Sequence, residues 1–170
     1  MRSLLLLVII SCLSVAMWSQ ETSSTSTLPN VKVKGIGGEA IHTGELGKEP
    51  LLVVCFWATW CKPCILELQT YAEHYDEWKE KTGVRIVAVS IDDSRNARKV
   101  PAFVQGRNWP FDVVLDENAD FKRAMNVNNV PHTFILKDGK VVWQHSAFAP
   151  GDEEDLEAQL TKLTAGGSSK

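Results

Sequence analysis

The feature that most restricts the fold is a continuous apolar segment followed directly by an amphipathic one. Leu51 to Trp57 (LLVVCFW) is apolar at every position, which is typical of a strand covered on both faces. Residues 62–81 then carry apolar side chains at spacings of three and four, and Gly83 follows as a helix stop. A buried strand that leads into a long helix predicts an α/β protein.

The rest of the chain continues this alternation. Further strands are predicted at residues 84–91, 111–115, 133–136 and 141–145, and further helices at 94–106, 118–125 and 152–163. Within residues 94–106, Pro101 is expected either to break the helix or to start a shorter one. Asp138-Gly139 separates the last two strands and predicts a tight hairpin, because a type I′ turn needs two positive φ angles. This order predicts an α/β fold whose mixed sheet has an antiparallel hairpin at one side.

Composition narrows the class of protein. The chain has 170 residues, of which 44% are hydrophobic, and this is enough for one domain with a sizeable core. The net charge of −3 gives no basic surface for a nucleic acid, so no nucleic-acid partner is expected. The 4 cysteines are too few for a disulfide-built mini-protein, so any cysteine chemistry must be local.

The N-terminus predicts export. Residues 1–19 combine Arg2 with the apolar run Leu4–Ile10, and apolar character continues in patches to Trp18. This stretch of about 15 residues is shorter than the roughly 20 of a membrane span, so residues 1–19 are interpreted as a signal peptide. Alternatively, Ile9-Ile10-Ser11-Cys12 resembles a lipoprotein signal, in which Cys12 would carry a lipid anchor. Either interpretation predicts a location in the periplasm or on the extracytoplasmic side of the membrane.

The remaining boundaries follow from polar segments at both ends. Residues 20–28 are predicted to be a flexible leader, and residues 164–170 a flexible tail. The folded domain is expected at residues 29–163.

Cys61 and Cys64 lie where the buried strand gives way to the long helix. The positive end of a helix dipole stabilises a thiolate, and the thiolate is the nucleophile in disulfide exchange. Pro63 suits the first turn, where no helical N–H is lost. We therefore expect Cys61 to be the exposed attacking cysteine and Cys64 the buried resolving one.

Three other interpretations of this pair remain open. A structural zinc ion needs four ligands, and His42, His74, His132 and His145 have no regular spacing that would complete a site. The pair could be a structural disulfide of an exported protein. It could also carry a metal ion between proteins. No metal site is expected.

The segment WATWCKPC resembles the active site of thioredoxin-fold proteins, specifically the exported thiol–disulfide oxidoreductases of the TlpA/ResA type. The segments VRIVAVSIDD and NWPFDVVLDENADFKRAMNVNNVPHTFILKDGKVV also fit, so the resemblance covers nearly the whole predicted mature chain. It implies a thioredoxin-like fold, a mixed central sheet flanked by helices, with residues 94–106 as the central insertion of the TlpA type. It also implies that Val130-Pro131 is a cis-proline loop that binds substrate together with Trp60.

The resemblance further implies a function. Such proteins reduce protein disulfides outside the cytoplasm, use no cofactor, and receive electrons from a membrane thiol carrier. The expected partners are disulfide-containing exported proteins, among them apo-cytochrome c. A disulfide-donating oxidase or isomerase, a peroxide reductase and a thiol-based metal-handling protein are the alternatives.

Three supporting positions near the cysteines each have two interpretations. Cys55 stands where thioredoxins carry a buried acid, and it is either a small buried hydrophobe or a third redox thiol. Lys62 occupies a position that is acidic in some cytochrome-maturing relatives. In this chain Lys62 either lowers the pKa of Cys61 or is a solvated side chain. Glu67 is either a carboxylate close to the thiols or a helix-dipole acid in the first turn.

Overall fold

The apolar segment Leu51–Trp57 forms strand β3 in the interior of the sheet, as the sequence predicts. All 7 of its residues are buried. Successive side chains of a strand point to opposite faces, and here they join two separate hydrophobic clusters: Leu51, Val53, Cys55 and Trp57 in one, Leu52, Val54 and Phe56 in the other. The strand is therefore covered on both faces.

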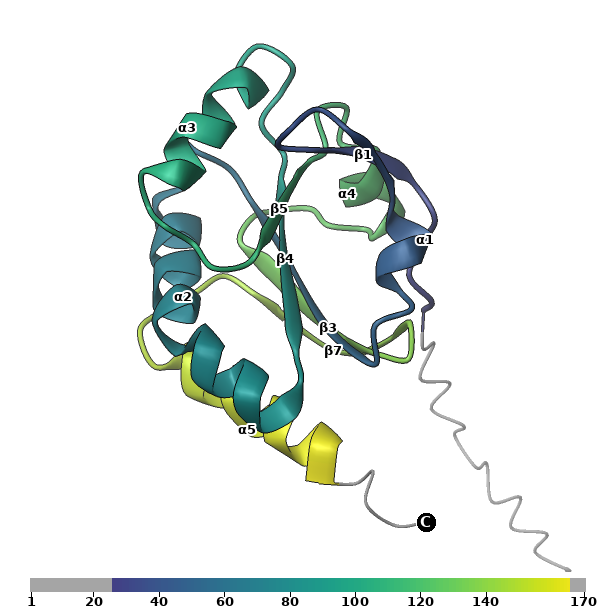
Figure 1. Ribbon diagram of the computed structural model, residues 1–170, viewed down its shortest axis with the longest axis vertical. Coiled ribbons are helices and arrows are strands. Elements are labelled where there is room, and N and C mark those ends of the chain that lie inside the picture. Colours follow the sequence, from purple (N-terminus) through teal and green to yellow (C-terminus); the bar gives the residue numbers. More distant parts are fainter. Residues whose placement is uncertain (1–25, 166–170) are drawn as a thin grey trace, which may run out of the picture.

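The computed structural model describes residues 26–165, which build a 7-stranded sheet in the order β2-β1-β5-β4-β3-β6-β7 (Figure 1). Strands β4 (Arg85–Ser90) and β5 (Asp112–Leu115) continue the sheet from β3 in parallel, whereas β6 (His132–Lys137) and β7 (Lys140–Ser146) run antiparallel. The other edge is an antiparallel pair, β1 (Lys32–Gly35) and β2 (Ala40–His42). The predicted mixed sheet with a C-terminal hairpin is confirmed.

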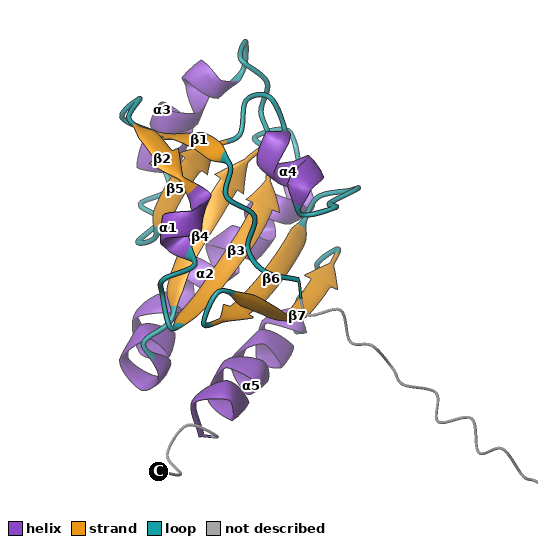
Figure 2. Ribbon diagram, turned by 90° about the vertical axis from the view of Figure 1, so that its right-hand side faces the viewer, coloured by secondary structure: helices purple, strands orange, loops and turns teal. Residues whose placement is uncertain are grey.

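Helices lie on both faces of this sheet (Figure 2). One face is covered by α2 (Lys62–Thr82), α3 (Val100–Gln105) and α5 (Asp152–Ala165), whose apolar side chains join the cluster that contains Cys55. The other face is covered by α1 (Thr43–Leu46) and α4 (Asp120–Ala124). No helix among residues 26–165 has the length and apolar character needed to cross a bilayer.

The hairpin between β6 and β7 has the turn that its sequence predicts. Asp138 and Gly139 have φ angles of 50° and 73°. Both values are positive, as a type I′ turn requires.

Two regions differ from the expectation. The hairpin β1–β2 and helix α1 were not predicted, because elements of 4, 3 and 4 residues are too short to show a periodic pattern. The helix expected at residues 94–106 is shorter: a 3-10 turn at Ala97–Lys99 leads into α3, which has Pro101 in its first turn. Proline is tolerated there because no helical N–H is lost.

The ends of the folded region also lie elsewhere than expected. The predicted signal peptide, residues 1–19, and most of the leader fall outside the described residues. Val141 N donates to Ser26 O at 2.9 Å and Leu28 N donates to Gly139 O at 2.9 Å, so this last part of the expected leader pairs with the β6–β7 hairpin. At the other end α5 continues to Ala165, past the expected boundary.

Candidate active site

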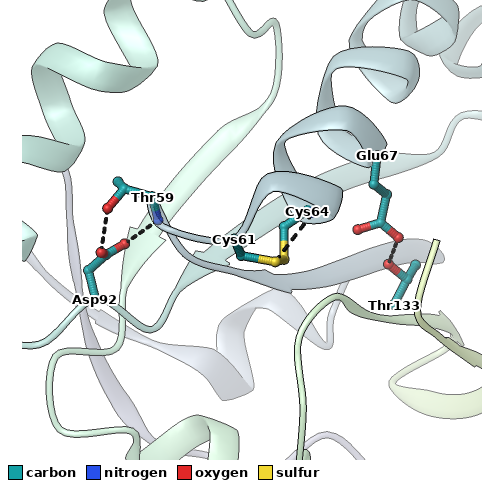
Figure 3. The surroundings of a disulfide bond; sticks show 6 residues. All are labelled: Thr59, Cys61, Cys64, Glu67, Asp92 and Thr133. Atoms are coloured by element: carbon teal, nitrogen blue, oxygen red, sulfur yellow. Dashed lines mark hydrogen bonds between the residues drawn. A yellow bond between two sulfur atoms is a disulfide. The ribbon is translucent and has the colours of Figure 1, made fainter. Parts of the chain in front are cut away.

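Cys61 and Cys64 are joined by a disulfide at the junction of β3 and α2 (Figure 3), with their Cα atoms 5.3 Å apart. After β3 the chain makes a tight turn, in which Cys61 N donates to Ala58 O at 3.0 Å. Helix α2 then begins with Cys61 as its N-cap residue. The strand therefore delivers the cysteine pair to the positive end of a 21-residue helix.

The two sulfurs differ in access and in bonding. Cys61 retains 5% of its surface, whereas Cys64 is 0% exposed. The Cys61 sulfur also accepts a hydrogen bond from Cys64 N at 3.3 Å. A helix N-terminus with a backbone N–H aimed at sulfur favours the thiolate form. Cys61 is therefore the more accessible cysteine of the pair, but it is buried and not exposed as the sequence predicts, because the turn before it and α2 enclose most of its surface.

The residues on either side of Cys61 form the outer rim of the site. Trp60 is 65% exposed, although it is a large aromatic side chain. Lys62 and Pro63 are also exposed, and Pro63 occupies the first turn of α2, as the sequence predicts. The rim therefore combines an apolar surface with one cation.

The Val130-Pro131 loop lies next to this rim because of the strand order. The Val130–Pro131 peptide bond is cis, and β6 begins at the following residue. Since β6 is antiparallel to β3, its first residue, His132, pairs with Phe56 near the end of β3. The loop is thus brought to the end of the sheet that carries the cysteines.

Glu67 is buried in the layer between α2 and the sheet, one helical turn after Cys64. Its oxygen Oε1 accepts hydrogen bonds from the Thr133 hydroxyl at 2.8 Å and from the Tyr71 hydroxyl at 3.1 Å. Its oxygen Oε2 has no partner among the described residues. Burial raises the pKa of Glu67 to about 7; the two hydrogen bonds act in the opposite direction, and the charge of Asp152 adds to the rise.

Cys55 lies in the same layer, beneath α2. It pairs in register with Thr133 of β6 and is 0% exposed. Burial, and then the charge of Glu67, raise the pKa of the Cys55 thiol well above its ordinary value. An uncharged, enclosed thiol favours the interpretation of Cys55 as a small buried hydrophobe.

Sequence reasoning missed a second buried carboxylate at the site, Asp92. It is 1% exposed and accepts hydrogen bonds from Thr59, two residues before Cys61 (Figure 3). One signal could have revealed it: parallel strands end at the same edge of a sheet, and Asp92 follows β4 just as the cysteines follow β3. The partners of Glu67, Tyr71 and Thr133, were missed as well.

Metal-ligating side chains do not gather anywhere in residues 26–165 in groups of three or more. The sulfurs of Cys61 and Cys64 are bonded to each other in this oxidised state. A metal ion bound through these two sulfurs would need the reduced form, because the thiolate is the ligand.

Comparison with known proteins places this site in a family. The family model described as AhpC/TSA matches residues 25–144, well over half of the chain. The chain belongs to the AhpC/TSA family. Within that family it is similar to the thiol-disulfide oxidoreductase ResA of Bacillus cereus, with 35% identity over 137 residues that cover 80% of this chain and 76% of the relative.

Solved structures show the same thioredoxin-like fold. A thioredoxin-like protein from Porphyromonas gingivalis has a TM-score of 0.74 and 41% identity, covering 84% of this chain and 94% of that one. A protein from Chlorobium tepidum titled a putative thiol:disulfide interchange protein DsbE has a TM-score of 0.72 and 25% identity, covering 82% and 96%. The predictions of a thioredoxin-like fold, of a ResA-type relationship and of a thiol–disulfide oxidoreductase are confirmed.

Proposed function

We propose that this protein reduces disulfides in other exported proteins, with Cys61 as the nucleophile and Cys64 as the resolving cysteine. The observation that carries the proposal is the unequal disulfide at the start of α2: 5% of Cys61 is accessible and none of Cys64. A substrate can form a mixed disulfide only with the accessible partner. The buried partner is placed to break it.

The exchange takes two steps and needs no cofactor. The Cys61 thiolate of the reduced protein attacks one sulfur of the substrate disulfide, forms a mixed disulfide, and releases the other substrate sulfur as a thiolate. Cys64, as a thiolate, then attacks the Cys61 sulfur, which closes the Cys61–Cys64 disulfide and releases the second substrate thiolate. The substrate gains two electrons and this protein loses them. A thiol carrier in the membrane is the proposed source of the electrons that regenerate the reduced form.

We assign to Glu67 the proton that Cys64 must lose before it attacks. Residues three apart on a helix face the same side, with Cβ atoms roughly 5–6 Å apart. In Figure 3 the Glu67 oxygen that is not bonded to Thr133 is turned to the side of the Cys61–Cys64 disulfide. That oxygen has no partner among the described residues, and the raised pKa of about 7 allows Glu67 to take up and release a proton near neutral pH.

Substrate recognition is assigned to the rim around Cys61. Trp60 offers an exposed apolar surface, and the Val130-Pro131 loop offers backbone groups at the same end of the sheet. A substrate peptide that hydrogen-bonds to this loop would add a strand next to the cysteines. Its side chains would then contact Trp60.

The relatives support a location outside the cytoplasm and a link to cytochrome c. The B. cereus relative is named a thiol-disulfide oxidoreductase ResA, and the C. tepidum structure is titled a putative DsbE. We propose export through the N-terminal segment and apo-cytochrome c among the substrates. A lipid anchor at Cys12 is the alternative to a cleaved signal.

A disulfide-donating oxidase is the second candidate, and Lys62 is the observation that favours it. A cation beside Cys61 stabilises the thiolate of the reduced form. Stabilising the reduced form raises the reduction potential and makes the oxidised protein a stronger oxidant.

A redox titration separates the two directions. The purified protein is equilibrated in thiol–disulfide buffers of graded potential, and the cysteine pairs are identified by mass spectrometry after alkylation. A Cys61–Cys64 couple near the thioredoxin potential of about −270 mV is expected for a reductase, whereas a value near about −120 mV indicates an oxidase. Cys55→Ala is the matched control and should retain the couple. If Cys61 and Cys64 form no reversible couple, the proposed function is wrong and metal binding becomes the leading candidate.

A further inference from the structure

The turn that precedes Cys61 is bonded to the end of β4 through a single buried carboxylate. Asp92 Oδ2 accepts hydrogen bonds from Thr59 N at 2.9 Å and from the Ser90 hydroxyl at 2.8 Å. Asp92 Oδ1 accepts a third from the Thr59 hydroxyl at 2.6 Å. Both oxygens are thus used, and two of the three donors belong to Thr59 (Figure 3).

This carboxylate is kept in place by hydrogen bonds alone. Asp92 is 1% exposed, and none of the ion pairs between residues 26 and 165 includes it. A buried carboxylate without a cation is unfavourable unless donors surround it. The same bonds that stabilise Asp92 therefore fix Thr59 relative to the sheet.

Thr59 lies within the turn that precedes Cys61, so fixing Thr59 also fixes the backbone of this turn. Ile91 N donates to Trp57 O at 2.9 Å below the turn, and Cys61 N donates to Ala58 O at 3.0 Å across it. Thr59 is the second residue of that turn, and the next two residues are the exposed Trp60 and the N-cap Cys61. The hydrogen bonds from Thr59 to Asp92 thus fix the turn relative to the end of β4. They lie immediately before Trp60 and Cys61, the two residues proposed to contact a substrate.

We propose that Thr59, Asp92 and Ser90 form a clamp that positions Trp60 and Cys61 for the incoming protein substrate. This inference rests on the proposed function, because it assumes that a protein disulfide is attacked at Cys61. The clamp contacts neither sulfur, so its members are positioning residues. A turn that is already ordered loses no further backbone freedom when substrate binds, which lowers the entropic cost of association.

The clamp has its largest role in the reduced protein. Opening the Cys61–Cys64 disulfide removes the side-chain cross-link between Cys61 and the first turn of α2, whereas the bonds from Thr59 to Asp92 do not involve sulfur. The reduced form is the one that attacks substrate. Loosening the clamp should therefore affect substrate encounter and the reactivity of Cys61 together.

The central test is Thr59→Val, which keeps the shape of the side chain and removes its hydroxyl. Reduction of insulin by the full-length protein, with dithiothreitol as reductant, gives KM and kcat. Thr59→Val is expected to raise KM about tenfold with kcat within about twofold of the wild type. Thr59→Ser restores the hydroxyl and is expected to return KM to within about twofold of the wild type.

A matched control separates positioning from general stability. Thr43, the first residue of α1, is 0% exposed, and its hydroxyl donates to Pro29 O at 2.6 Å and accepts from Val31 N at 2.8 Å. Thr43→Val removes a hydroxyl that, like that of Thr59, is hydrogen-bonded within the fold, but from a region outside the site. It is expected to lower stability as Thr59→Val does and to leave KM unchanged.

Asp92 itself supplies a second pair of variants. In Asp92→Asn the amide oxygen can still accept from Thr59 N and from Ser90, and the amide nitrogen can donate to a rotated Thr59 hydroxyl. KM is therefore expected to stay within about twofold of the wild type for Asp92→Asn and to rise about tenfold for Asp92→Ala. Equal increases in both variants would overturn the proposal, because the charge and not the hydrogen bonds would then set the position.

A readout that needs no substrate distinguishes failure of the clamp from failure of the proposed function. The rate at which iodoacetamide alkylates Cys61 is measured against pH in the reduced protein. Thr59→Val is expected to slow alkylation about threefold at pH 7, because a misplaced Cys61 loses the thiolate stabilisation of the N-cap position. If Thr59→Val matches Thr43→Val in both KM and alkylation, the clamp is wrong. If the wild type fails to reduce insulin while the alkylation difference appears, the proposed function is wrong, and the clamp positions Cys61 without a role toward a protein substrate.

Discussion

Two buried carboxylates flank the active-site disulfide, and they are bonded in opposite ways. Asp92 accepts three hydrogen bonds that use both of its oxygens. Glu67 accepts two hydrogen bonds, both on Oε1, and its Oε2 has no partner among the described residues. The donors around both Asp92 oxygens suit that side chain to a positioning role, whereas the oxygen of Glu67 that has no partner leaves room for a proton.

The difference follows from where each carboxylate lies. Asp92 follows the end of β4, where the backbone and hydroxyl of Thr59 and the hydroxyl of Ser90 converge on it. Glu67 lies between a helix and the middle of a sheet whose backbone groups are already paired, so only the hydroxyls of Tyr71 and Thr133 reach it. Burial next to an incomplete set of donors disfavours the ionised form. The site thus contains one carboxylate suited to position the turn and one suited to exchange a proton.

The largest expected effect is a decrease in the free energy of unfolding as Glu67 ionises with rising pH. The folded protein keeps the Glu67 proton up to a pKa of about 7, whereas the unfolded chain releases it near 4.5. The stability from this group is therefore complete below pH 4.5, is lost as pH rises to about 7, and amounts to about 3 kcal/mol. In urea denaturation of the oxidised protein, Glu67→Gln should lack this decline and Glu73→Gln, on the exposed side of α2, should retain it. Parallel stability curves for wild type and Glu67→Gln would show that Glu67 ionises normally.

The second prediction concerns the rate of the resolving step. Without a proton acceptor beside Cys64, Glu67→Gln should slow the breakdown of the mixed disulfide about a hundredfold at pH 7. The first attack by Cys61 should keep its rate. Single-turnover mixing of the reduced protein with a disulfide-bonded peptide, quenched by acid and followed by mass spectrometry, measures both steps. Unchanged lifetimes of the mixed disulfide in Glu67→Gln would remove Glu67 from the mechanism.

Asp92 should contribute to stability rather than to proton transfer. Asp92→Ala leaves Thr59 N–H, the Thr59 hydroxyl and the Ser90 hydroxyl without their acceptor, and is expected to lower the free energy of unfolding by about 2 kcal/mol. Ser90→Ala removes one donor to the Asp92 carboxylate and the acceptor of Asp92 N–H, and should cost about 1 kcal/mol. Urea denaturation at pH 7 measures both values. A slower resolving step in Asp92→Ala, at unchanged Cys61 reactivity, would contradict the division of roles between the carboxylates.

The smallest predicted effect tests whether Thr133 tunes Glu67. The Thr133 hydroxyl donates to Glu67 Oε1 and favours the ionised form, so Thr133→Val should move the pKa of Glu67 further upward. Thr133→Ser keeps the donor and should leave that pKa in place. Carboxyl carbon NMR of selectively labelled protein follows the titration directly. A downward movement in Thr133→Val would mean that another donor replaces the hydroxyl.

Much of the fold follows from the sequence because its signals are long or chemically specific. The apolar run Leu51–Trp57 and the amphipathic segment after it predict β3 and α2. Asp138-Gly139 predicts the last hairpin. The short strands β1 and β2 give no such pattern, and they form because β1 pairs with the open edge of β5.

The site shows the same division on a smaller scale. Cys61 and Cys64 are evident from their spacing and from the helix that begins there. Asp92 and Asp93 are adjacent and chemically equal in the sequence, yet only Asp92 is buried against Thr59 while Asp93 is exposed. No local pattern separates them, because the difference depends on which of the two side chains faces the neighbouring strand end.

The sequence by itself determined the succession of strands and helices from β3 onward, the reactive cysteine pair and its place at the start of a helix. These depend on contacts between residues that are close in the chain. The tertiary structure decided which carboxylates lie next to the cysteine pair and what they bond to. Glu67 and Thr133 are separated by 66 in the sequence, and Thr59 and Asp92 by 33, so each pair meets only when the strands align. Distant residues therefore decide how many hydrogen bonds each carboxylate accepts. The number of these bonds in turn suits Asp92 to a positioning role and Glu67 to proton exchange.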